Sequence, residues 1–328
     1  MKAGYAPRMQ SESEDGGRIV AAIDIGTNSV KITVGRRTAR GVEVLLDRVE
    51  ITRLGKGVDA GGRLSDEAIH RTLTALASFG QDARNLRAER IAAVGTSALR
   101  DAANGAEFVA RAERDLGGSV EVISGDREAD LTYAAARHDP DLGLPSDPDT
   151  VLVTIDIGGG STEIVVGRGD VREFRRSLQI GAVRLTERAL PSDPPTTAER
   201  GDAARIADDI LSVVPVPAGG RVVVVGSGGT VASLAAMDLM EENPGATVTP
   251  DALHGRRLSV GQIESRIERL SAVPLAERKA TPGLEPARAD VILAGAILQA
   301  RVLRRLGATD LTVSARGLRF GLLYELLG

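Results

Sequence analysis

The chain has 328 residues, a net charge of −4 and a hydrophobic content of 42%, enough for two α/β domains that each bury a core. It contains no cysteine, which excludes thiol catalysis, disulfides and cysteine zinc sites. It contains no tryptophan, and aromatic residues make up only 2%, so few side chains could stack on the bases of single-stranded nucleic acid. The slight acidity argues against a broad nucleic-acid or membrane surface, and no apolar run reaches the length of a membrane span. The absence of cysteine is compatible with a reducing cytosol, and a cytoplasmic protein is predicted.

Residues 1–17 are predicted to be a disordered polar tail, because they lack the apolar segment of a signal peptide. The apolar run 19–24 predicts the first strand, and it ends in the motif Asp24-Ile-Gly-Thr-Asn-Ser29. Two further strands, 32–35 and 42–52, complete a predicted antiparallel meander. Glycine and small polar residues directly after a strand leave backbone N–H groups accessible to an anion.

A helix is predicted to begin after Ser65, a suitable N-cap, and its apolar residues recur at helical spacing. The strand 90–94 then leads into Gly95-Thr-Ser-Ala-Leu-Arg100. The remaining predicted elements of this part are a helix over 106–116, a strand over 120–123 and a helix over 125–137. The order βββαβαβα describes a complete mixed-sheet lobe, assigned to residues 18–138.

Residues 139–149 are rich in proline and aspartate and predict a linker, followed by a second lobe over 150–328. Its predicted strands are 151–156, 162–167, 171–178, 221–225 and 310–313. Its predicted helices are 182–190, 197–213, 230–240, 260–271, 286–306 and 318–327. The second lobe therefore repeats the order of the first, with inserted helices.

The repeat is clearest in Asp156-Ile-Gly-Gly-Gly-Ser-Thr-Glu163, which lies about 130 residues after Asp24-Ile-Gly26 and has the same layout. An internal duplication of a strand, a phosphate loop and a strand predicts two similar lobes with a cleft between them. An aspartate beside a phosphate loop repels the phosphate unless a cation lies between them, which indicates Mg²⁺. The alternative is a glycine-rich hairpin with a capping aspartate.

Together with Ser124-Gly-Asp-Arg-Glu-Ala129 and Gly226-Ser-Gly-Gly-Thr230, these motifs resemble the exopolyphosphatase and guanosine pentaphosphate phosphohydrolase (Ppx/GppA) family, in its short two-domain type. The resemblance implies an α/β protein with the duplicated actin-like ATPase (ribonuclease H-like) fold, two lobes and an interlobe cleft. It also implies Mg²⁺ or another divalent metal, inorganic polyphosphate or guanosine pentaphosphate as substrate, and a homodimer. Ala315 and Phe320 depart from the family pattern, which puts contacts near the last helix in doubt.

The expected metal ligands are Asp24, Asp156 and Glu163, although Glu163 could instead be an outward-facing strand residue. Arg100 is expected among the catalytic residues, where its guanidinium fork could hold a phosphate; the alternative is a surface arginine at a helix start. The expected phosphate-binding residues are Gly26, Thr27, Asn28, Ser29, Thr96, Ser97, Gly158, Gly159, Gly160, Ser161, Thr162, Gly228 and Gly229. The segment containing Gly228 and Gly229 could equally be a plain turn from strand to helix.

Glu128 is the candidate catalytic base, since hydrolysis of a terminal phosphoryl group needs an aligned water and a carboxylate that accepts its proton. It falls in the first turn of a predicted helix, where the helix dipole alone would also favour a glutamate. The resemblance favours the catalytic role, because the glutamate at this motif position is the family's proposed base.

Three functions stay open: exopolyphosphatase, guanosine pentaphosphate 5′-phosphohydrolase, and a non-catalytic sensor of polyphosphate or an alarmone. Three arginine pairs, at 175–176, 256–257 and 304–305, could line a polyphosphate track or simply face solvent.

Overall fold

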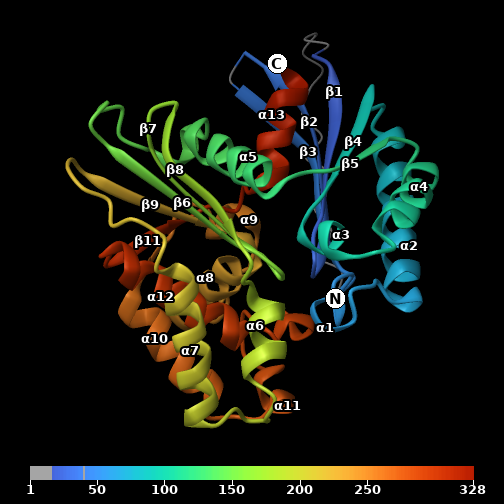
Figure 1. The fold of residues 1–328 in the computed structure, drawn as a ribbon. Coiled ribbons are helices and arrows are strands. Elements are labelled where there is room, and N and C mark those ends of the chain that lie inside the picture. The colour runs from blue at the N-terminus through green and yellow to red at the C-terminus, as the bar shows by residue number, and fades with distance from the viewer. Residues whose placement is uncertain (1–16, 40) are drawn as a thin grey trace. The chain divides into compact units, whose positions relative to one another are not determined.

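The computed structural model describes residues 17–39 and 41–328 and divides into two compact units (Figure 1). The first unit comprises the described residues up to Ser124 together with Leu318–Gly328, and the second comprises Gly125–Gly317. The predicted tail, 1–17, lies outside the described residues except for Gly17. No helix in the described ranges is both long and apolar enough to cross a lipid bilayer.

The first unit contains a five-stranded sheet in the order β3-β2-β1-β4-β5. The strands β1, β2 and β3 form the predicted antiparallel meander, and β4 and β5 run parallel to β1. Their bounds are β1 Ile19–Ile25, β2 Ser29–Thr38, β3 Gly41–Ile51, β4 Arg90–Gly95 and β5 Ser119–Val122. The central strand β1 is apolar on both faces and buried along nearly its whole length, as its unbroken hydrophobic run predicted.

The helices of the first unit are α1 Val58–Gly61, α2 Asp66–Asn85, α3 Ser97–Asp101, α4 Gly105–Leu116 and α13 Leu318–Leu327. Ser65 caps α2 as predicted, with its Oγ accepting a hydrogen bond from the Ala68 N–H at 3.3 Å. The residues at helical spacing, Ile69, Leu73, Leu76 and Phe79, are buried in the core against the sheet. Periodicity therefore predicted this packing correctly.

The last helix, α13, packs on β1 and β2 and is held there by a buried ion pair. The Arg319 guanidinium donates to both carboxylate oxygens of Asp47, at 3.0 and 2.8 Å, and to Thr33 Oγ1 at 2.8 Å. The Arg319 side chain is 7% exposed and that of Asp47 18%. Removing the arginine would leave the carboxylate in a poorly solvated position.

Arg319→Ala is accordingly expected to lower the free energy of unfolding by about 3 kcal/mol, the usual cost of stranding one partner of a buried pair. Denaturant unfolding followed by circular dichroism measures this change. The control is Arg36→Ala, which breaks the more exposed pair with Glu43 in the same sheet and should cost at most about 1 kcal/mol. Equal losses in the two variants would contradict the role given to Arg319.

The second unit contains a six-stranded sheet in the order β10-β11-β9-β6-β7-β8. Its strands are β6 Val151–Ile157, β7 Thr162–Arg168, β8 Val171–Leu178, β9 Val222–Ser227, β10 Arg257–Ser259 and β11 Asp310–Val313. The meander β6-β7-β8 and the parallel strands β9 and β11 repeat the topology of the first sheet, which confirms the predicted duplicated fold. The added edge strand β10 has only three residues, too few to show a periodic pattern.

The helices of the second unit lie on both faces of its sheet (Figure 1). Their bounds are α5 Gly125–Arg137, α6 Ala182–Ala189, α7 Thr197–Leu211, α8 Gly228–Glu242, α9 Pro250–Leu253, α10 Val260–Ser271, α11 Leu275–Arg278 and α12 Ile292–Leu306, with 3₁₀ turns at Pro140–Leu142 and Pro286–Arg288. The helix predicted over 286–306 begins only at Ile292, because its first residues form the second of these 3₁₀ turns.

Two helices correct the predicted domain boundaries. The helix α5 belongs to the second unit, since Ala129, Tyr133 and Ala136 pack on Leu152 and other residues of that sheet. The helix α13 belongs to the first unit. The chain therefore passes between the units at 124/125 and again at 317/318. The last helix of each βββαβαβα repeat belongs to the unit formed by the other repeat.

The segment predicted as a linker, 139–149, lies inside the second unit. Its first residue, Asp139, has a fully buried side chain that accepts a hydrogen bond from Arg316 Nη1 at 2.6 Å. His254 Nε2 lies 3.4 Å from the other carboxylate oxygen. A segment anchored by a buried carboxylate is part of a packed unit, so its proline and aspartate content misled the prediction.

Candidate functional site

The two Asp-Ile-Gly motifs fold into the same hairpin turn, once in each unit. In the first, the Gly26 N–H donates to the Ser29 carbonyl at 3.0 Å; in the second, the Gly158 N–H donates to the Ser161 carbonyl, also at 3.0 Å. Each turn follows the apolar central strand of its sheet and returns into the antiparallel neighbour. The sequence duplication is thus a duplication of local geometry.

In the second unit, the carbonyl groups of the turn point toward the start of α6. Gly158 O accepts from the Ala182 N–H at 2.9 Å, and Gly159 O accepts from the next two N–H groups of the helix. A Cβ on Gly181 would lie 2.5 Å from Gly159 O, so only glycine allows this approach. Among the described residues, no backbone carbonyl accepts from the N–H groups of 159–161, which leaves these donors available to an anion.

In the first unit, the segment after β3 binds the carbonyl groups of the turn in the same way. Thr27 O accepts from the Gly55 N–H at 2.8 Å, and Asn28 O accepts from the N–H groups of Thr52 and Arg53. Asn28 is 8% exposed, and its Nδ2 has no hydrogen-bond partner in the described part of the chain. A buried amide without a partner is costly unless a ligand supplies the acceptor.

Asp156 ends β6 and is held by the turn after β9. Ser227 Oγ donates to Asp156 Oδ2 at 2.9 Å. Gly228 has a φ of +93°, and a Cβ there would lie 2.5 Å from Asp156 Oδ1, so glycine is required by conformation and by space. The segment 226–230 is therefore a strand-to-helix turn that also fixes the position of the Asp156 carboxylate.

Three carboxylates of the second unit influence one another. Glu163 lies opposite Asp156 in the β6–β7 pairing, and Ser177 Oγ donates to Glu163 Oε1 at 2.6 Å. Burial, and then the negative charges of Glu128 and Asp156, raise the pKa of Glu163 well above its ordinary value. Glu163 is only 2% exposed, which rules out an outward-facing strand position.

Glu128 lies in the first turn of α5, as predicted, and is 8% exposed. The helix starts close to β8, since a Cβ on Gly125 would lie 2.3 Å from Ser177 Cβ. This approach brings Glu128 into the electrostatic range of Glu163. A glutamate that serves only the helix dipole would gain nothing from burial beside a second carboxyl group.

The carboxylates of Asp156 and Glu163 suit a magnesium ion, which prefers oxygen ligands and keeps several waters. A divalent cation would offset the repulsion that raises the Glu163 pKa. No group of three acidic or histidine side chains has metal-ligating geometry within the described ranges, so water and substrate would have to complete the coordination. The predicted ligand of the first unit, Asp24, accepts a hydrogen bond from Lys31 Nζ at its Oδ2, at 2.9 Å.

The other predicted residues of the first unit lie after β4. Thr96 and Ser97 are buried, and Ser97 Oγ lies 3.2 Å from Asp101 Oδ2. Arg100 is in the last turn of α3, where its Nη1 donates to the Ile123 carbonyl at 3.0 Å. This bond ties the Arg100 guanidinium to the end of β5, so it is not a mobile surface arginine.

Sequence reasoning missed Arg288, which is the last residue of the 3₁₀ turn Pro286–Arg288. A Cβ on Gly229 would lie only 2.0 Å from Arg288 Nη1, so the guanidinium lies directly against the start of α8. Burial lowers the Arg288 pKa, and its side chain has no hydrogen-bond or ion-pair partner among the described residues. A half-buried guanidinium at a helix N-terminus is a suitable place for an anion.

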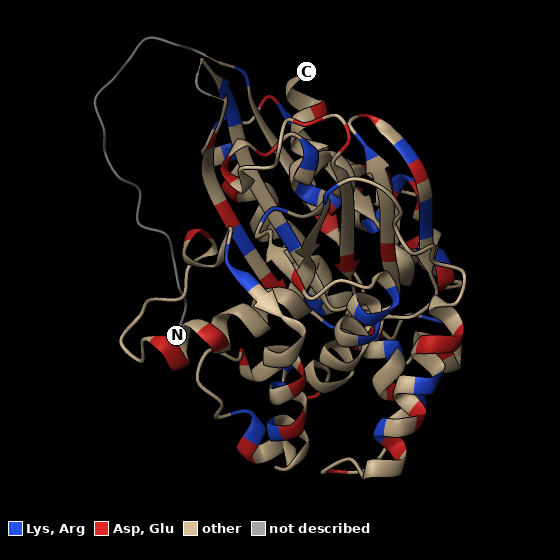
Figure 2. Cartoon of the chain, turned by 90° about the vertical axis from the view of Figure 1, so that its left-hand side faces the viewer, with Lys and Arg blue, Asp and Glu red and all other residues tan. Residues whose placement is uncertain are grey.

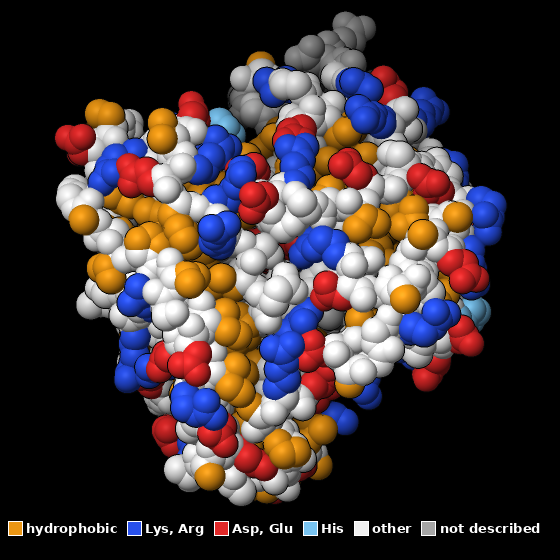
Figure 3. Space-filling view, viewed as in Figure 1, with side chains coloured by type: hydrophobic (Ala, Val, Ile, Leu, Met, Phe, Trp, Pro, Cys, Tyr) orange, Lys and Arg blue, Asp and Glu red, His pale blue; other side chains and the backbone are white. Residues whose placement is uncertain are grey.

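Ion pairs account for at least one member of each arginine pair that could have formed a polyphosphate track, and for both members of the second pair, since Arg257 binds Asp310. Arg175 binds Asp130 and Asp126, Arg256 binds Asp238 and Glu242, and Arg304 binds Glu264. Positive and negative residues are interspersed along the helices and strands in Figure 2, and their side chains are mixed across the face drawn in Figure 3. These arginines are satisfied by neighbouring acids, which favours the solvent-facing interpretation.

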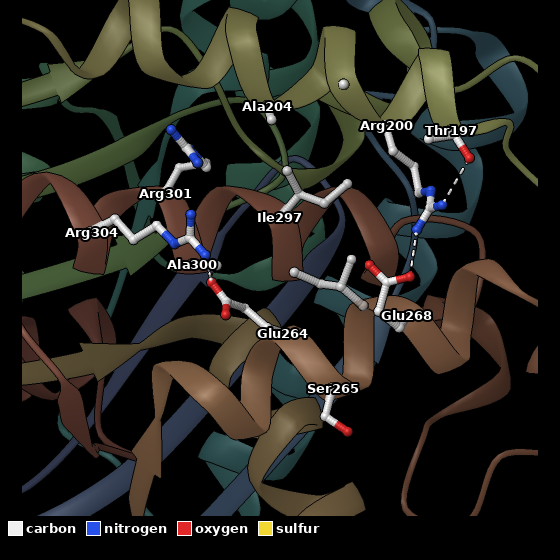
Figure 4. A pocket seen from close by; sticks show the side chains of 12 residues that line it. Thr197, Arg200, Ala204, Glu264, Ser265, Glu268, Ile297, Ala300, Arg301 and Arg304 are labelled. Carbon is white, nitrogen blue, oxygen red and sulfur yellow. Dashed lines mark hydrogen bonds and ion pairs between the residues drawn. The ribbon is translucent and has the colours of Figure 1, made fainter.

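A groove of about 580 Å³ lies between α7, α10 and α12 (Figure 4). Its floor includes Ala204 and Ile297, and its rim carries the pair Arg200–Glu268 at 3.0 Å. None of the predicted catalytic, phosphate-binding or metal-binding residues lines this groove. Its size alone does not make it the site of the chemistry.

Residues 33–328 match the model of the Ppx/GppA phosphatase family. The chain is 39% identical over 324 residues to Exopolyphosphatase 2 of Mycobacterium tuberculosis, a match that covers 94% of this chain and 98% of the relative. It is 32% identical over 313 residues to a guanosine-5′-triphosphate,3′-diphosphate pyrophosphatase of Photobacterium profundum, covering 94% of this chain but 59% of the relative. The crystal structure of the Aquifex aeolicus member of the Ppx/GppA family is similar, with a TM-score of 0.77, 35% identity, and coverage of 94% of this chain and 98% of that one.

Proposed function

The chain belongs to the Ppx/GppA phosphatase family and is a hydrolase of that family, and on this premise we propose that it is an exopolyphosphatase that removes the terminal phosphate of inorganic polyphosphate. The observation that carries the proposal is the grouping of Glu128, Asp156 and Glu163 in one unit that also contains a turn with unused N–H donors. Open N–H groups suit phosphate oxygens, and a carboxylate beside them suits a water nucleophile.

In the proposed reaction, Glu128 orients a water and accepts its proton as the water oxygen bonds to the terminal phosphorus. The bridging P–O bond breaks, and the shortened polyphosphate leaves with the bonding electrons. The N–H groups of 159–161 would hold the non-bridging oxygens of the phosphoryl group. Thr162 is fixed beside them, since its Oγ1 donates to the Ile180 carbonyl at 2.6 Å.

Asp156 and Glu163 would hold the magnesium ion, whose contribution when bound is to neutralise charge on the phosphate oxygens. Ser227 and Gly228 keep the Asp156 carboxylate in one position for this role. In the first unit, we propose that Arg100, Thr96, Ser97 and the turn 26–29 bind further phosphate groups. The unpartnered Asn28 amide supports this assignment.

The second candidate is hydrolysis of the 5′ γ-phosphate of guanosine pentaphosphate, and Arg288 favours it. A nucleotide with phosphates on both its 5′ and 3′ oxygens presents two separate anionic groups. Arg288 at the start of α8 offers an anion site in addition to the glycine turn. The Photobacterium profundum relative is named for action on such a nucleotide.

Phosphate release from the purified protein tests these functions, with polyphosphates of several lengths, guanosine pentaphosphate and ATP compared side by side. We expect turnover of polyphosphate. Turnover of guanosine pentaphosphate alone would favour the second candidate, and binding without release would favour a sensor.

The KM values of the variant Arg288→Ala distinguish the two candidate substrates. If Arg288 binds the second anionic group of a nucleotide, the variant should raise the KM for guanosine pentaphosphate about tenfold or more, the scale of one lost charge-assisted hydrogen bond. The KM for polyphosphate should change less than about threefold. Equal effects on both substrates would assign Arg288 to general phosphate binding.

A further inference from the structure

The turn that follows β11, residues 314–317, reaches a carboxylate of the candidate site within the second unit. A Cβ on Gly317 would lie 3.3 Å from Asp156 Oδ2 and 3.7 Å from Ser227 Oγ. Ser227 donates its hydrogen bond to that same carboxylate oxygen. A shift of the turn would therefore change the immediate surroundings of Asp156 Oδ2.

His254 holds the middle of this turn. The Ala315 N–H donates to His254 Nδ1 at 3.3 Å, and the His254 side chain is only 9% exposed. The other ring nitrogen, Nε2, lies 3.4 Å from Asp139 Oδ2. Because Nδ1 accepts a hydrogen bond from a backbone N–H, the ring is neutral in this arrangement and has its proton on Nε2.

Other contacts hold the turn on either side of Ala315. The Ser314 N–H donates to the Gly226 carbonyl at 2.7 Å, and Ser314 Oγ accepts from the Arg316 N–H at 3.1 Å. The Arg316 guanidinium binds Asp139 at 2.6 Å. These contacts leave the Ala315 N–H to His254, so the imidazole provides a separate anchor for the turn.

Protonation of the ring would remove this anchor, because Nδ1 would become a donor that faces another donor. Burial lowers the pKa of His254, and the charge of Arg316 lowers it further, whereas Asp139, Asp141 and Asp251 act in the opposite direction. The hydrogen bond is therefore intact at neutral pH and is lost on acidification.

We propose that neutral His254 is a positioning residue of the candidate site: its Nδ1 fixes the Ala315 N–H and thereby the turn that packs Gly317 against Asp156. Protonation of the ring releases the turn. The inference rests on the proposed function for the role of Asp156 in phosphate hydrolysis, whereas the anchoring of the turn does not depend on that role.

Hydrogen exchange of the Ala315 amide, followed by nuclear magnetic resonance at neutral pH, tests the anchor without substrate. Asparagine at 254 places its amide oxygen where Nδ1 lies, whereas glutamine places its amide near the position of Nε2. We expect His254→Asn to keep the protection factor within about threefold of the wild type, and His254→Gln to lower it about tenfold, the scale of one lost hydrogen bond. Equal protection in the two variants would overturn the proposal.

Turnover between pH 5 and pH 8 tests the link from the turn to Asp156. His254→Gln should lower kcat about tenfold at neutral pH and leave KM within about threefold, since loss of an outer contact of a metal ligand commonly has an effect of this size. His254→Asn should keep kcat within about threefold, and acidification should reduce its kcat less than that of the wild type. Any acid-dependent loss that both proteins share belongs to other groups.

The matched control is His138→Asn, because His138 is exposed. It should have the kcat and the pH profile of the wild type. Wild-type kcat in His254→Gln, or the wild-type pH profile in His254→Asn, would overturn the proposal.

Circular dichroism and thermal unfolding check each variant, and His254→Leu, which also lacks an acceptor, replaces His254→Gln if the latter does not fold. The exchange experiment does not measure turnover, so failure of the inference can be distinguished from failure of the proposed function. A protein that hydrolyses none of the substrates but shows the expected exchange pattern would contradict the proposed function and support the anchoring of the turn by His254.

Discussion

Glu128→Gln is expected to lower the turnover of polyphosphate by about two to four orders of magnitude, the usual contribution of a general base. The amide has the same shape as the carboxylate and still fits the buried first turn of α5, but it cannot accept a proton from water. Substrate binding should stay close to that of the wild type, because the proposed phosphate donors are elsewhere. Initial rates at saturating substrate, together with equilibrium binding, measure both quantities.

The matched control is Asp126→Asn, which neutralises another acid in the same helical turn. Asp126 is 54% exposed and pairs with Arg175 on the surface, so its loss should change turnover less than about threefold. If Glu128→Gln retained turnover within the same factor, Glu128 would not be the base. The favourable interaction of a glutamate with the helix dipole would then be a sufficient explanation of its position.

Removal of divalent metal should abolish activity, and Asp156→Ala should reproduce that loss at any magnesium concentration. We expect a decrease of about a hundredfold or more, since the charge neutralisation supplied by a bound metal is worth several kcal/mol. Phosphate release is measured after treatment with excess EDTA and again after Mg²⁺ is restored. Restored activity in the wild type, but not in Asp156→Ala, is the expected pattern.

Asp170→Asn controls for the loss of one negative charge from the second unit, because Asp170 is exposed in the turn between β7 and β8. It should have full activity and the magnesium dependence of the wild type. Full wild-type activity in excess EDTA would exclude the metal-dependent reaction.

Local patterns predicted most of the elements and the local position of several candidate site residues. The strand preceding each Asp-Ile-Gly motif, the cap at Ser65 and the place of Glu128 in a first helical turn are all present in the structure. Each depends on residues within a few positions of one another. Hydrophobic periodicity and capping report on that range of the chain.

Three features could not be predicted because they depend on how segments of the chain pair and pack in space. Periodicity shows that α5 and α13 have apolar faces, but not which sheet they cover. The pair of Asp24 and Lys31 becomes visible only once the hairpin register is known. Arg288 lies nearly sixty residues after Gly229, and nothing in either segment indicates their approach.

The passage of α13 back to the first unit has a consequence for biosynthesis. Domains of a growing chain generally fold as they leave the ribosome, starting with the N-terminal one. Here the residues of the second unit, Gly125–Gly317, are all synthesised before α13, whereas β1 and β2 wait for that helix to cover them. The C-terminal unit is therefore able to complete its fold first, and β1 and β2 lack the cover of α13 until translation has passed Leu327.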